Sequence, residues 1–228
     1  MTSFSFAGDR VLVTGASSGI GRAVALAFGR SGAKVGVDYR SDRAGADAVV
    51  AAIRDGGGEA AAIAGDVADE GSVAAMFAAM NDAFGGVDCV IVNAGVQADG
   101  EIGEMTFADW RKVMAVNLDG AFLTARAAIA RFRDNPDHGD GRGRGRLVFV
   151  TSVHETIPWS GHANYAAAKG GVRLLMQSLA KETAAEGIRV NAVAPGPVHT
   201  GINDDVMADR DARREVLAQV TMARLRAV

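Results

Sequence analysis

The chain has 228 residues, of which 49 % are hydrophobic, and its 24 Lys and Arg against 27 Asp and Glu give a formal net charge of −3. This length and apolar content are typical of a globular chain with a sizeable core, and they exclude fibrous and disordered classes of protein. Because the net charge is small and the basic residues are scattered, we expect neither a nucleic-acid partner nor a membrane partner.

The first strand-like segment is RVLVTG at residues 10–15, and an amphipathic helix follows from about Gly19 to Arg30. Further strands are expected at residues 33–39, 60–67, 87–95, 146–152 and 188–196, with helices between them. This alternation predicts an α/β fold with a doubly wound, mainly parallel sheet and helices on both faces. No linker or repeat divides the chain, so we expect one domain over 1–228.

The first turn, TGASSGIG at residues 14–21, carries Gly15, Gly19 and Gly21 between the first strand and the first helix. Glycine allows positive φ and close backbone approach, while the helix that follows directs free N–H groups at an anion. The turn therefore favours a Rossmann-like domain that binds the pyrophosphate of a dinucleotide. A tight turn with only a structural role is the alternative.

The interval between the fourth and fifth strands is long. We expect a helix there from about Trp110 to Arg131, followed by a surface loop at 134–145, where Pro, Asp and Gly are frequent. The single cysteine, Cys89, lies in the apolar run VDCVIV and has no partner for an intrachain disulfide. Because no intrachain disulfide can form, we expect the protein in a reducing compartment. Without a signal-like start or an apolar run of membrane-spanning length, we expect a cytoplasmic protein.

The stretch NYAAAKGG at 164–171 puts Tyr165 and Lys169 on one face of an expected helix. The same face continues in Val172, Met176 and Leu179, so it should be buried. A lysine held near a core beside a tyrosine is either a snorkelling side chain or one half of an acid–base pair.

The motifs together resemble the classical short-chain dehydrogenase/reductase family. TGASSGIG is similar to that family's TGxxxGxG turn, and the segment from Asn93 to Gly95, Asn117, Ser152 and the YxxxK of Tyr165 and Lys169 stand in the family's order. PGPVHT at 195–200 is similar to its PG segment. The resemblance implies a nicotinamide cofactor bound by Gly15, Ser17, Ser18, Gly19, Ile20, Gly21, Tyr39, Arg40, Ser41, Asp66, Val67, Asn93, Ala94, Gly95, Tyr165, Lys169, Pro195, Gly196, Val198 and Thr200.

The end of the second strand, VDYRSD, bears on the choice of cofactor. A carboxylate there would bind the ribose of NAD, and an arginine would pair with the 2′-phosphate of NADP. By the resemblance Tyr39 takes the discriminating position and Arg40 the next, which favours NADP with NAD as the alternative. Asp38 is one residue early and is expected to point to the opposite side of the strand. Arg40 as a solvated strand-end charge and Asp66 as an ordinary turn residue remain alternatives.

The resemblance assigns catalysis to Asn117, Ser152, Tyr165 and Lys169. Bringing the pKa of a phenol from about 10 to near 7 takes roughly 4 kcal/mol, and a cation about 4 Å away supplies a similar amount at an effective dielectric near 20. Lys169 is expected to be that cation, while Ser152 would hold the substrate oxygen and Asn117 would organise a water. A capping role for Ser152 and a backbone clip by Asn117 are the alternatives.

Within the family, TSVHETIPW and NYAAAKGG are most similar to the glucose 1-dehydrogenase branch. That implies oxidation of a sugar hemiacetal, with substrate contacts at Ser152, His154, Glu155, Asn164 and Tyr165. Reduction of a 3-oxoacyl thioester or small ketone is the alternative, which the apolar residues Ile157, Trp159, Val198, Val206 and Met207 keep open. No metal site is expected, because Pro158 stands where HExxH would need a histidine.

A third reading is an inactive dinucleotide-binding protein. After Asn203 the sequence offers one polar helix, whereas family members continue through another helix and a last strand. We therefore expect the family's last helix and last strand to be missing. We also expect a homo-oligomer, either a dimer or a tetramer, if the short C-terminal segment permits it.

Overall fold

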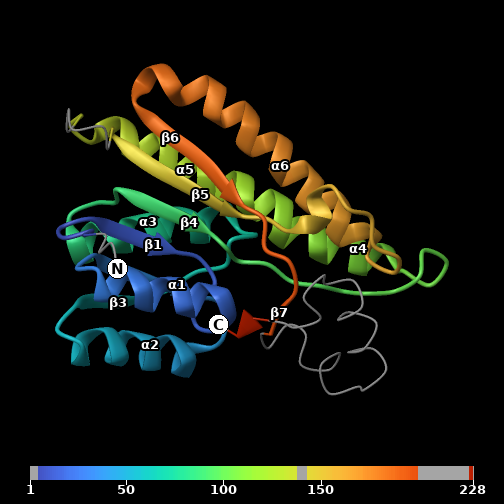
Figure 1. Cartoon of the computed structure of the whole chain (residues 1–228), viewed down its shortest axis with the longest axis horizontal. Coiled ribbons are helices and arrows are strands. Elements are labelled where there is room, and N and C mark those ends of the chain that lie inside the picture. The colour runs from blue at the N-terminus through green and yellow to red at the C-terminus, as the bar shows by residue number, and fades with distance from the viewer. Residues whose placement is uncertain (1–4, 138–142, 200–225, 228) are drawn as a thin grey trace.

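The computed structural model describes residues 5–137, 143–199 and 226–227. Within them the chain forms a six-stranded parallel sheet of order β3-β2-β1-β4-β5-β6 (Figure 1). Its strands are β1 Arg10–Val13, β2 Lys34–Tyr39, β3 Glu59–Ala64, β4 Cys89–Val92, β5 Gly145–Val150 and β6 Ile188–Val193. The predicted Rossmann-like, doubly wound fold is confirmed. Because the strand order reverses between β1 and β4, a crevice opens at their carboxyl ends.

Helices connect the strands on both faces of the sheet (Figure 1). They are α1 Gly19–Arg30, α2 Arg43–Asp55, α3 Glu70–Phe84, α4 Phe107–Met114, the π-helix Ala115–Asp119, α5 Gly120–Asp134, the 3₁₀ turns Val153–Glu155 and Ala184–Glu186, and α6 Ala163–Thr183. The side chains of Asp42, Asp69 and Thr106 accept amide hydrogen bonds at the starts of α2, α3 and α4. A second, two-stranded sheet pairs β7 Val198–His199 with β8 Arg226–Ala227.

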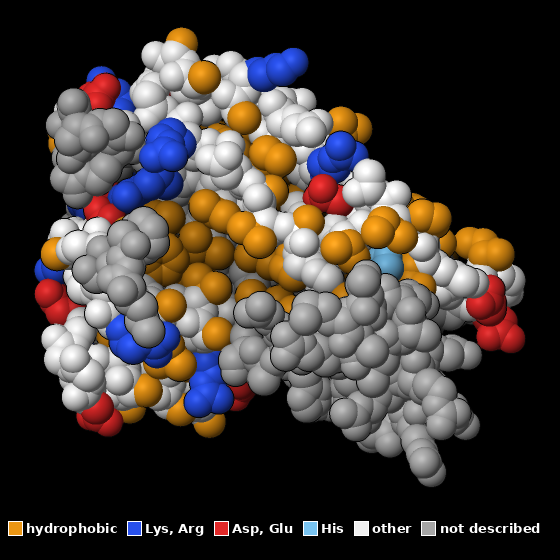
Figure 2. Space-filling model, in the orientation of Figure 1, with side chains coloured by type: hydrophobic (Ala, Val, Ile, Leu, Met, Phe, Trp, Pro, Cys, Tyr) orange, Lys and Arg blue, Asp and Glu red, His pale blue; other side chains and the backbone are white. Residues whose placement is uncertain are grey.

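Two apolar layers enclose the large sheet. On one face, valines of β1 and β2 pack against α1 and α2, with Ile53 among the buried residues. On the other face, α3, α5 and α6 pack through residues such as Met76, Phe132 and Val172. Figure 2 shows further hydrophobic side chains gathered on the visible face of the molecule, between clusters of charged residues. The layers hold the carboxyl ends of the parallel strands at one edge of the sheet, where the site lies.

Cys89 lies in β4, between β1 and β5, and is only 4 % exposed. Burial raises the pKa of its thiol to about 12. Its predicted role as a small core residue matches this position.

The strands end earlier than the sequence pattern predicted. β1 stops at Val13 and not at Gly15, β4 at Val92 and not at Gly95, and β6 at Val193 and not at Gly196. The residues just past β1 and β4 give their backbone groups to side chains: the amide of Asn93 donates to Thr14 Oγ1 at 2.9 Å. The residues just past β1 and β4, such as Gly15, Asn93 and Gly95, therefore line the crevice and do not extend the sheet.

The helix expected from Trp110 to Arg131 is longer and interrupted. It runs from Phe107 to Asp134, with five residues of π-helix between α4 and α5. By length and apolar content alone this run could cross a membrane, as core helices of other proteins could, and 44 % of its most apolar stretch is buried within the protein. Helical periodicity marks the run correctly, but it does not reveal the extra residue that widens a π turn.

Candidate active site

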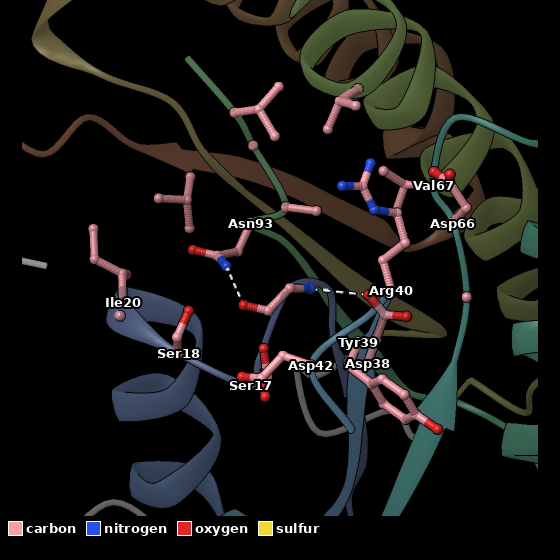
Figure 3. Close-up of a pocket in the computed structure, with 18 of the residues that line it drawn as sticks. Ser17, Ser18, Ile20, Asp38, Tyr39, Arg40, Asp42, Asp66, Val67 and Asn93 are labelled. Carbon is pink, nitrogen blue, oxygen red and sulfur yellow. Dashed lines mark hydrogen bonds between the residues drawn. The ribbon is translucent and has the colours of Figure 1, made fainter. Parts of the chain in front are cut away.

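A cleft of about 430 Å³ opens at the carboxyl ends of the strands (Figure 3). The sequence-predicted cofactor residues that line it are Gly15, Ser17, Ser18, Gly19, Ile20, Tyr39, Arg40, Ser41, Asp66, Val67, Asn93, Ala94, Gly95, Tyr165 and Lys169. Gly21, Pro195, Gly196 and Val198 do not line the cleft, and Thr200, Val206 and Met207 lie outside the described residues. Most of the predicted set is thus brought together in space.

The glycine turn is shaped to admit an anion. Gly15 and Gly19 adopt φ of +61° and +53°, a region that residues with a Cβ rarely enter. A Cβ on Gly21 would lie 2.3 Å from the carbonyl oxygen of Gly15. Ser18, the N-cap of α1, makes no side-chain hydrogen bond to the first turn, so the N–H groups of that turn remain for a ligand. The arrangement fits the pyrophosphate of a dinucleotide.

Asn93 holds this turn in place. Its side-chain nitrogen donates to the carbonyl oxygens of Thr14 at 2.8 Å and Gly15 at 3.2 Å. The hydroxyl of Thr14 in turn accepts the amides of Asn93 and Ala94 at 2.9 and 3.0 Å. Asn93 therefore builds the wall of the cleft from β4, and Thr14 is a partner that the sequence did not single out.

The omission of Asp38 from the predicted site was wrong. Its Oδ2 accepts the amide of Gly15 at 2.9 Å, and the residue lines the cleft although it is only 2 % exposed (Figure 3). The other carboxyl oxygen, Oδ1, has no partner among the described residues. Burial raises the pKa of Asp38 to about 7, against the Gly15 hydrogen bond and with a further contribution from the charge of Asp66. The glycine turn folds back over the end of β2, so alternation along the strand does not take the carboxyl away from the site.

The rim that follows β2 carries the residues predicted to choose between cofactors. Tyr39 is buried in the core that faces α2, whereas Arg40 is exposed at the cleft. Figure 3 shows the two side chains leaving the strand end in different directions. Asp66 also lines the cleft, but its Oδ1 accepts the amide of Ala68 at 2.9 Å. One oxygen of Asp66 is therefore engaged in its own turn, as the alternative reading proposed.

Tyr165 and Lys169 reach the same cleft from α6. Lys169 is 5 % exposed; its Nζ donates to the carbonyl of Val150 at 3.0 Å and lies 5.6 Å from the centroid of the Tyr165 ring. Burial lowers the pKa of Lys169 to about 8, against the charge of Glu155. The two side chains thus share the buried face that their spacing predicted.

The expected lowering of the Tyr165 pKa is not found. Burial raises the pKa of Tyr165; a hydrogen bond with Ser152 opposes this, and the charge of Asp99 adds to it. Desolvation of the phenolate is the largest cause, and the nearby ammonium of Lys169 is itself desolvated and bonded to a backbone carbonyl. The correction is that Lys169 alone does not bring the phenol near neutral pKa.

Asn117 lies within the π-helix and is 2 % exposed. Its Nδ2 donates to the carbonyl of Val96 at 3.0 Å, and its Oδ1 accepts the amide of Val96 at 2.8 Å. This two-way clip ties the loop after β4 to the helix, and a Cβ on Gly95 would lie 3.8 Å from Lys169 Nζ. The backbone clip weighed from the sequence is therefore present beside the lysine.

Comparison with known proteins agrees with this arrangement. The family model described as short chain dehydrogenase matches residues 9–211. The chain belongs to the short-chain dehydrogenase family.

Relatives in this family carry several activities. The 3beta-hydroxysteroid dehydrogenase 1 of Eggerthella lenta is 44 % identical over 206 residues, which cover 90 % of this chain and 77 % of that protein. Glucose 1-dehydrogenase 2 of Bacillus subtilis is 35 % identical, covering 94 % and 81 %. The crystal structure of a gluconate 5-dehydrogenase from Burkholderia cenocepacia, in complex with NADP and tartrate, superposes with a TM-score of 0.89 at 29 % identity, covering 99 % and 85 %. These relatives are oxidoreductases with different substrates.

The residues that were predicted to contact the substrate of this short-chain dehydrogenase differ in burial and in their hydrogen-bond partners. Asn164 is fully buried, its Nδ2 donating to the carbonyl of Ala98 at 2.8 Å and its Oδ1 accepting the amide of Tyr165. Its assignment as a substrate contact was therefore wrong, because a long-range backbone bond consumes its amide. Glu155 lies 3.7 Å from Arg173 of α6, and Ser152 Oγ accepts the amide of His154 at 3.2 Å.

Sequence reasoning missed several residues that line the cleft. Besides Asp38 these are Asp42, Gly65, Val96, Val116, Val150 and Thr151. Asp42 could have been found as the cap of α2, and the others lie one or two positions from predicted residues. The described part of the chain holds no group of three or more His, Cys, Asp or Glu placed to bind a metal ion.

Proposed function

We propose that the protein is an NAD(P)-dependent oxidoreductase that interconverts a secondary alcohol, or the hemiacetal of a sugar, and a carbonyl, with Tyr165 as the acid and base. One observation carries this proposal: Tyr165 and Lys169 line the same cleft as the glycine turn at the start of α1. A proton carrier and a dinucleotide cradle are the two parts that hydride transfer to or from an alcohol carbon requires.

The residues present fit a nicotinamide dinucleotide. The first turn of α1 would hold the pyrophosphate, and Arg40 at the rim would pair with a 2′-phosphate. We propose NADP as the preferred cofactor and NAD as the weaker one; the NADP in the Burkholderia relative supports this choice. When bound, the nicotinamide supplies the hydride acceptor or donor and a positive charge beside the phenol.

The chain's own part in the reaction is to bind the substrate oxygen and move its proton. Ser152 lies close enough to Tyr165 to favour its phenolate, acting to lower its pKa, so a substrate hydroxyl held by both side chains would be aimed at the phenol oxygen. In oxidation Tyr165 accepts that hydroxyl proton, and in reduction it returns it. Lys169 stabilises the phenolate from the same helical face, and Asn117 fixes the loop after β4 against the lysine.

For the substrate we propose a polar alcohol of the sugar type, as in the glucose and gluconate dehydrogenases among the relatives. The charged and polar side chains of the segment after Ser152, such as His154, support this class. Reduction of a 3-oxoacyl thioester or a small ketone is the second candidate: Ile157 in the same segment is 57 % exposed and could face an acyl chain. We further propose a homo-oligomer, because the exposed side chains of Phe107 and Phe122 on α4 and α5 offer a surface for a second copy. A cytoplasmic location is also part of the proposal.

The test is absorbance of the reduced nicotinamide with NADP or NAD against glucose, gluconate, a hydroxysteroid and an oxoacyl thioester. We expect turnover of at least one polar alcohol, and a loss of about 100-fold or more in Tyr165→Phe with unchanged cofactor affinity, because only the proton carrier is removed. Full activity in that variant would reject Tyr165. Cofactor binding without turnover of any compound in either direction would favour the inactive dinucleotide-binding protein.

A further inference from the structure

We propose that His162, as an imidazolium paired with Asp99, is a positioning residue that locks the loop after β4 onto the segment before Tyr165 and offsets the charge of Asp99 at the phenol. This inference rests on the proposed role of Tyr165. It adds a proton-dependent element formed by residues that do not line the cofactor cleft.

The hydrogen-bond partners of His162 set its charge state. Its Nδ1 lies 2.8 Å from the carbonyl oxygen of Ser160, and its Nε2 lies 3.2 Å from Oδ2 of Asp99. Both neighbours are acceptors only. Since neutral imidazole has one N–H, the two contacts can be hydrogen bonds together only if both nitrogens carry hydrogen. The geometry therefore selects the imidazolium form.

The face of the ring supports the same form. Trp159 stacks on His162 with centroids 3.4 Å apart and planes 3° from parallel. A cation over an indole face is stabilised by the ring quadrupole. On the other face of Trp159 lies His154, at 4.3 Å, whose Nδ1 is 3.0 Å from the carbonyl oxygen of Ile157. One N–H of His154 satisfies that contact.

Three further bonds join the same two segments. The amide of Gly100 donates to the carbonyl of Gly161 at 2.9 Å, and Ser160 Oγ donates to Glu101 at 3.2 Å. Asn164 bridges to the carbonyl of Ala98, as described above. The clasp, defined as residues 98–101 with 159–164, therefore ends at the residue immediately before Tyr165. Its charged pair is the part that responds to pH.

The charges around the clasp connect it to the proposed chemistry. Asp99 raises the pKa of Tyr165, because a carboxylate disfavours a nearby phenolate. The pKa of His162 is itself raised: burial acts to lower it, but Asp99 and the carbonyl of Ser160 favour the charged form more strongly. Among the residues that the structure describes, the other titratable neighbours are Glu101, through Ser160, and His154, beyond Trp159.

The sign of the effect follows from these directions. Below its raised pKa, His162 is charged and compensates Asp99, so the phenolate of Tyr165 is easier to form. As pH rises through that value the imidazolium loses a proton, one of its two hydrogen bonds is lost, and Asp99 acts on Tyr165 without compensation. Alcohol oxidation should then need a higher pH for the same rate.

The experiment compares His162→Gln, Asp99→Asn and the double variant in pH profiles of kcat/KM for alcohol oxidation. Glu104→Gln, an exposed carboxylate of the same loop, is the control. The comparison is made with saturating oxidised cofactor, whose positive charge lowers the pKa of Tyr165 and brings the rising limb into the range where His162 is charged. There we expect the limb to move to higher pH in His162→Gln and to lower pH in Asp99→Asn. In each case kcat/KM at a fixed pH on the limb should change by about 10-fold, which corresponds to one pKa unit. The double variant should return close to the wild type, and cofactor affinity should not change.

A clasp with only a structural role would move both single variants in the same direction, and that result would overturn the proposal. A second measurement is independent of turnover: the NMR titration of the His162 ring, assigned by its loss in His162→Gln. It should give a pKa above the ordinary value of about 6.5 in the wild type and a lower one in Asp99→Asn. A titration at or below the ordinary value would also refute the pair. If Tyr165→Phe keeps full activity, the proposed function fails instead, whatever this titration gives.

Discussion

Replacement of Asp38 by asparagine tests whether burial in the cleft raises the pKa of this carboxyl group. The amide keeps the shape of the side chain and an oxygen that accepts the Gly15 amide, but it cannot ionise. In the wild type the pKa of Asp38 is raised from 3.8 to about 7 by burial. The folded protein therefore holds the proton more tightly than the unfolded chain, and the free energy of unfolding falls as pH rises from about 4 to about 7.

The size of the effect follows from the shift. About 3 pKa units at about 1.4 kcal/mol each correspond to about 4 kcal/mol across that window. Asp38→Asn avoids this cost, so we expect it to be more stable than the wild type by a margin that grows with pH and levels off above about pH 7. The measurement is denaturant unfolding of the cofactor-free protein at several pH values.

The matched control is Asp82→Asn, an exposed carboxylate on α3, which should leave the pH dependence as it is. A constant difference between Asp38→Asn and the wild type from about pH 5 to about pH 8 would refute the reasoning. It would mean that Asp38 ionises in the folded protein as easily as in water.

Arg40→Ala should weaken NADP by about 10-fold or more and NAD little, because only NADP offers the 2′-phosphate; equal losses in a fluorescence titration of both cofactors would reduce Arg40 to a solvated charge. Lys169→Met should lower both turnover and cofactor affinity, since it removes the buried cation and its bond to Val150; unchanged affinity would rule out a contact with the cofactor. Gly21→Ala places a Cβ 2.3 Å from the Gly15 carbonyl oxygen, so we expect a loss of about 1–3 kcal/mol in unfolding experiments together with weaker cofactor binding. Native stability and affinity in that variant would show that the turn can relax.

The parts of the fold that depend on local pattern were predictable. Apolar runs and helical periodicity located the six main strands and α1, because the spacing of apolar residues that marks a strand or a helix depends only on residues close together in the sequence. The glycine turn was predictable because few residues tolerate its backbone. The spacing of Tyr165 and Lys169 identified a shared buried face, which the structure contains.

The parts that depend on distant contacts were not predictable. Asn164 looked like a polar substrate contact, but the carbonyl that buries its amide belongs to Ala98 in another loop. The pairing of His162 with Asp99 has the same long-range origin. The pKa of Tyr165 was misjudged because the sequence shows that a cation is near but not how much water is removed from both groups.

The placement of Cys89 in the middle of the sheet gives the protein a built-in reporter of its own opening. The sequence has no other thiol, and this one, with its pKa raised to about 12, is almost wholly protonated and hidden while β4 stays paired. A thiol-reactive dye can therefore label only molecules in which the neighbours of β4 have separated. The labelling rate, measured with and without a nicotinamide cofactor, would report how much a ligand at the strand ends reduces the opening of the sheet around β4. The measurement needs no engineered probe.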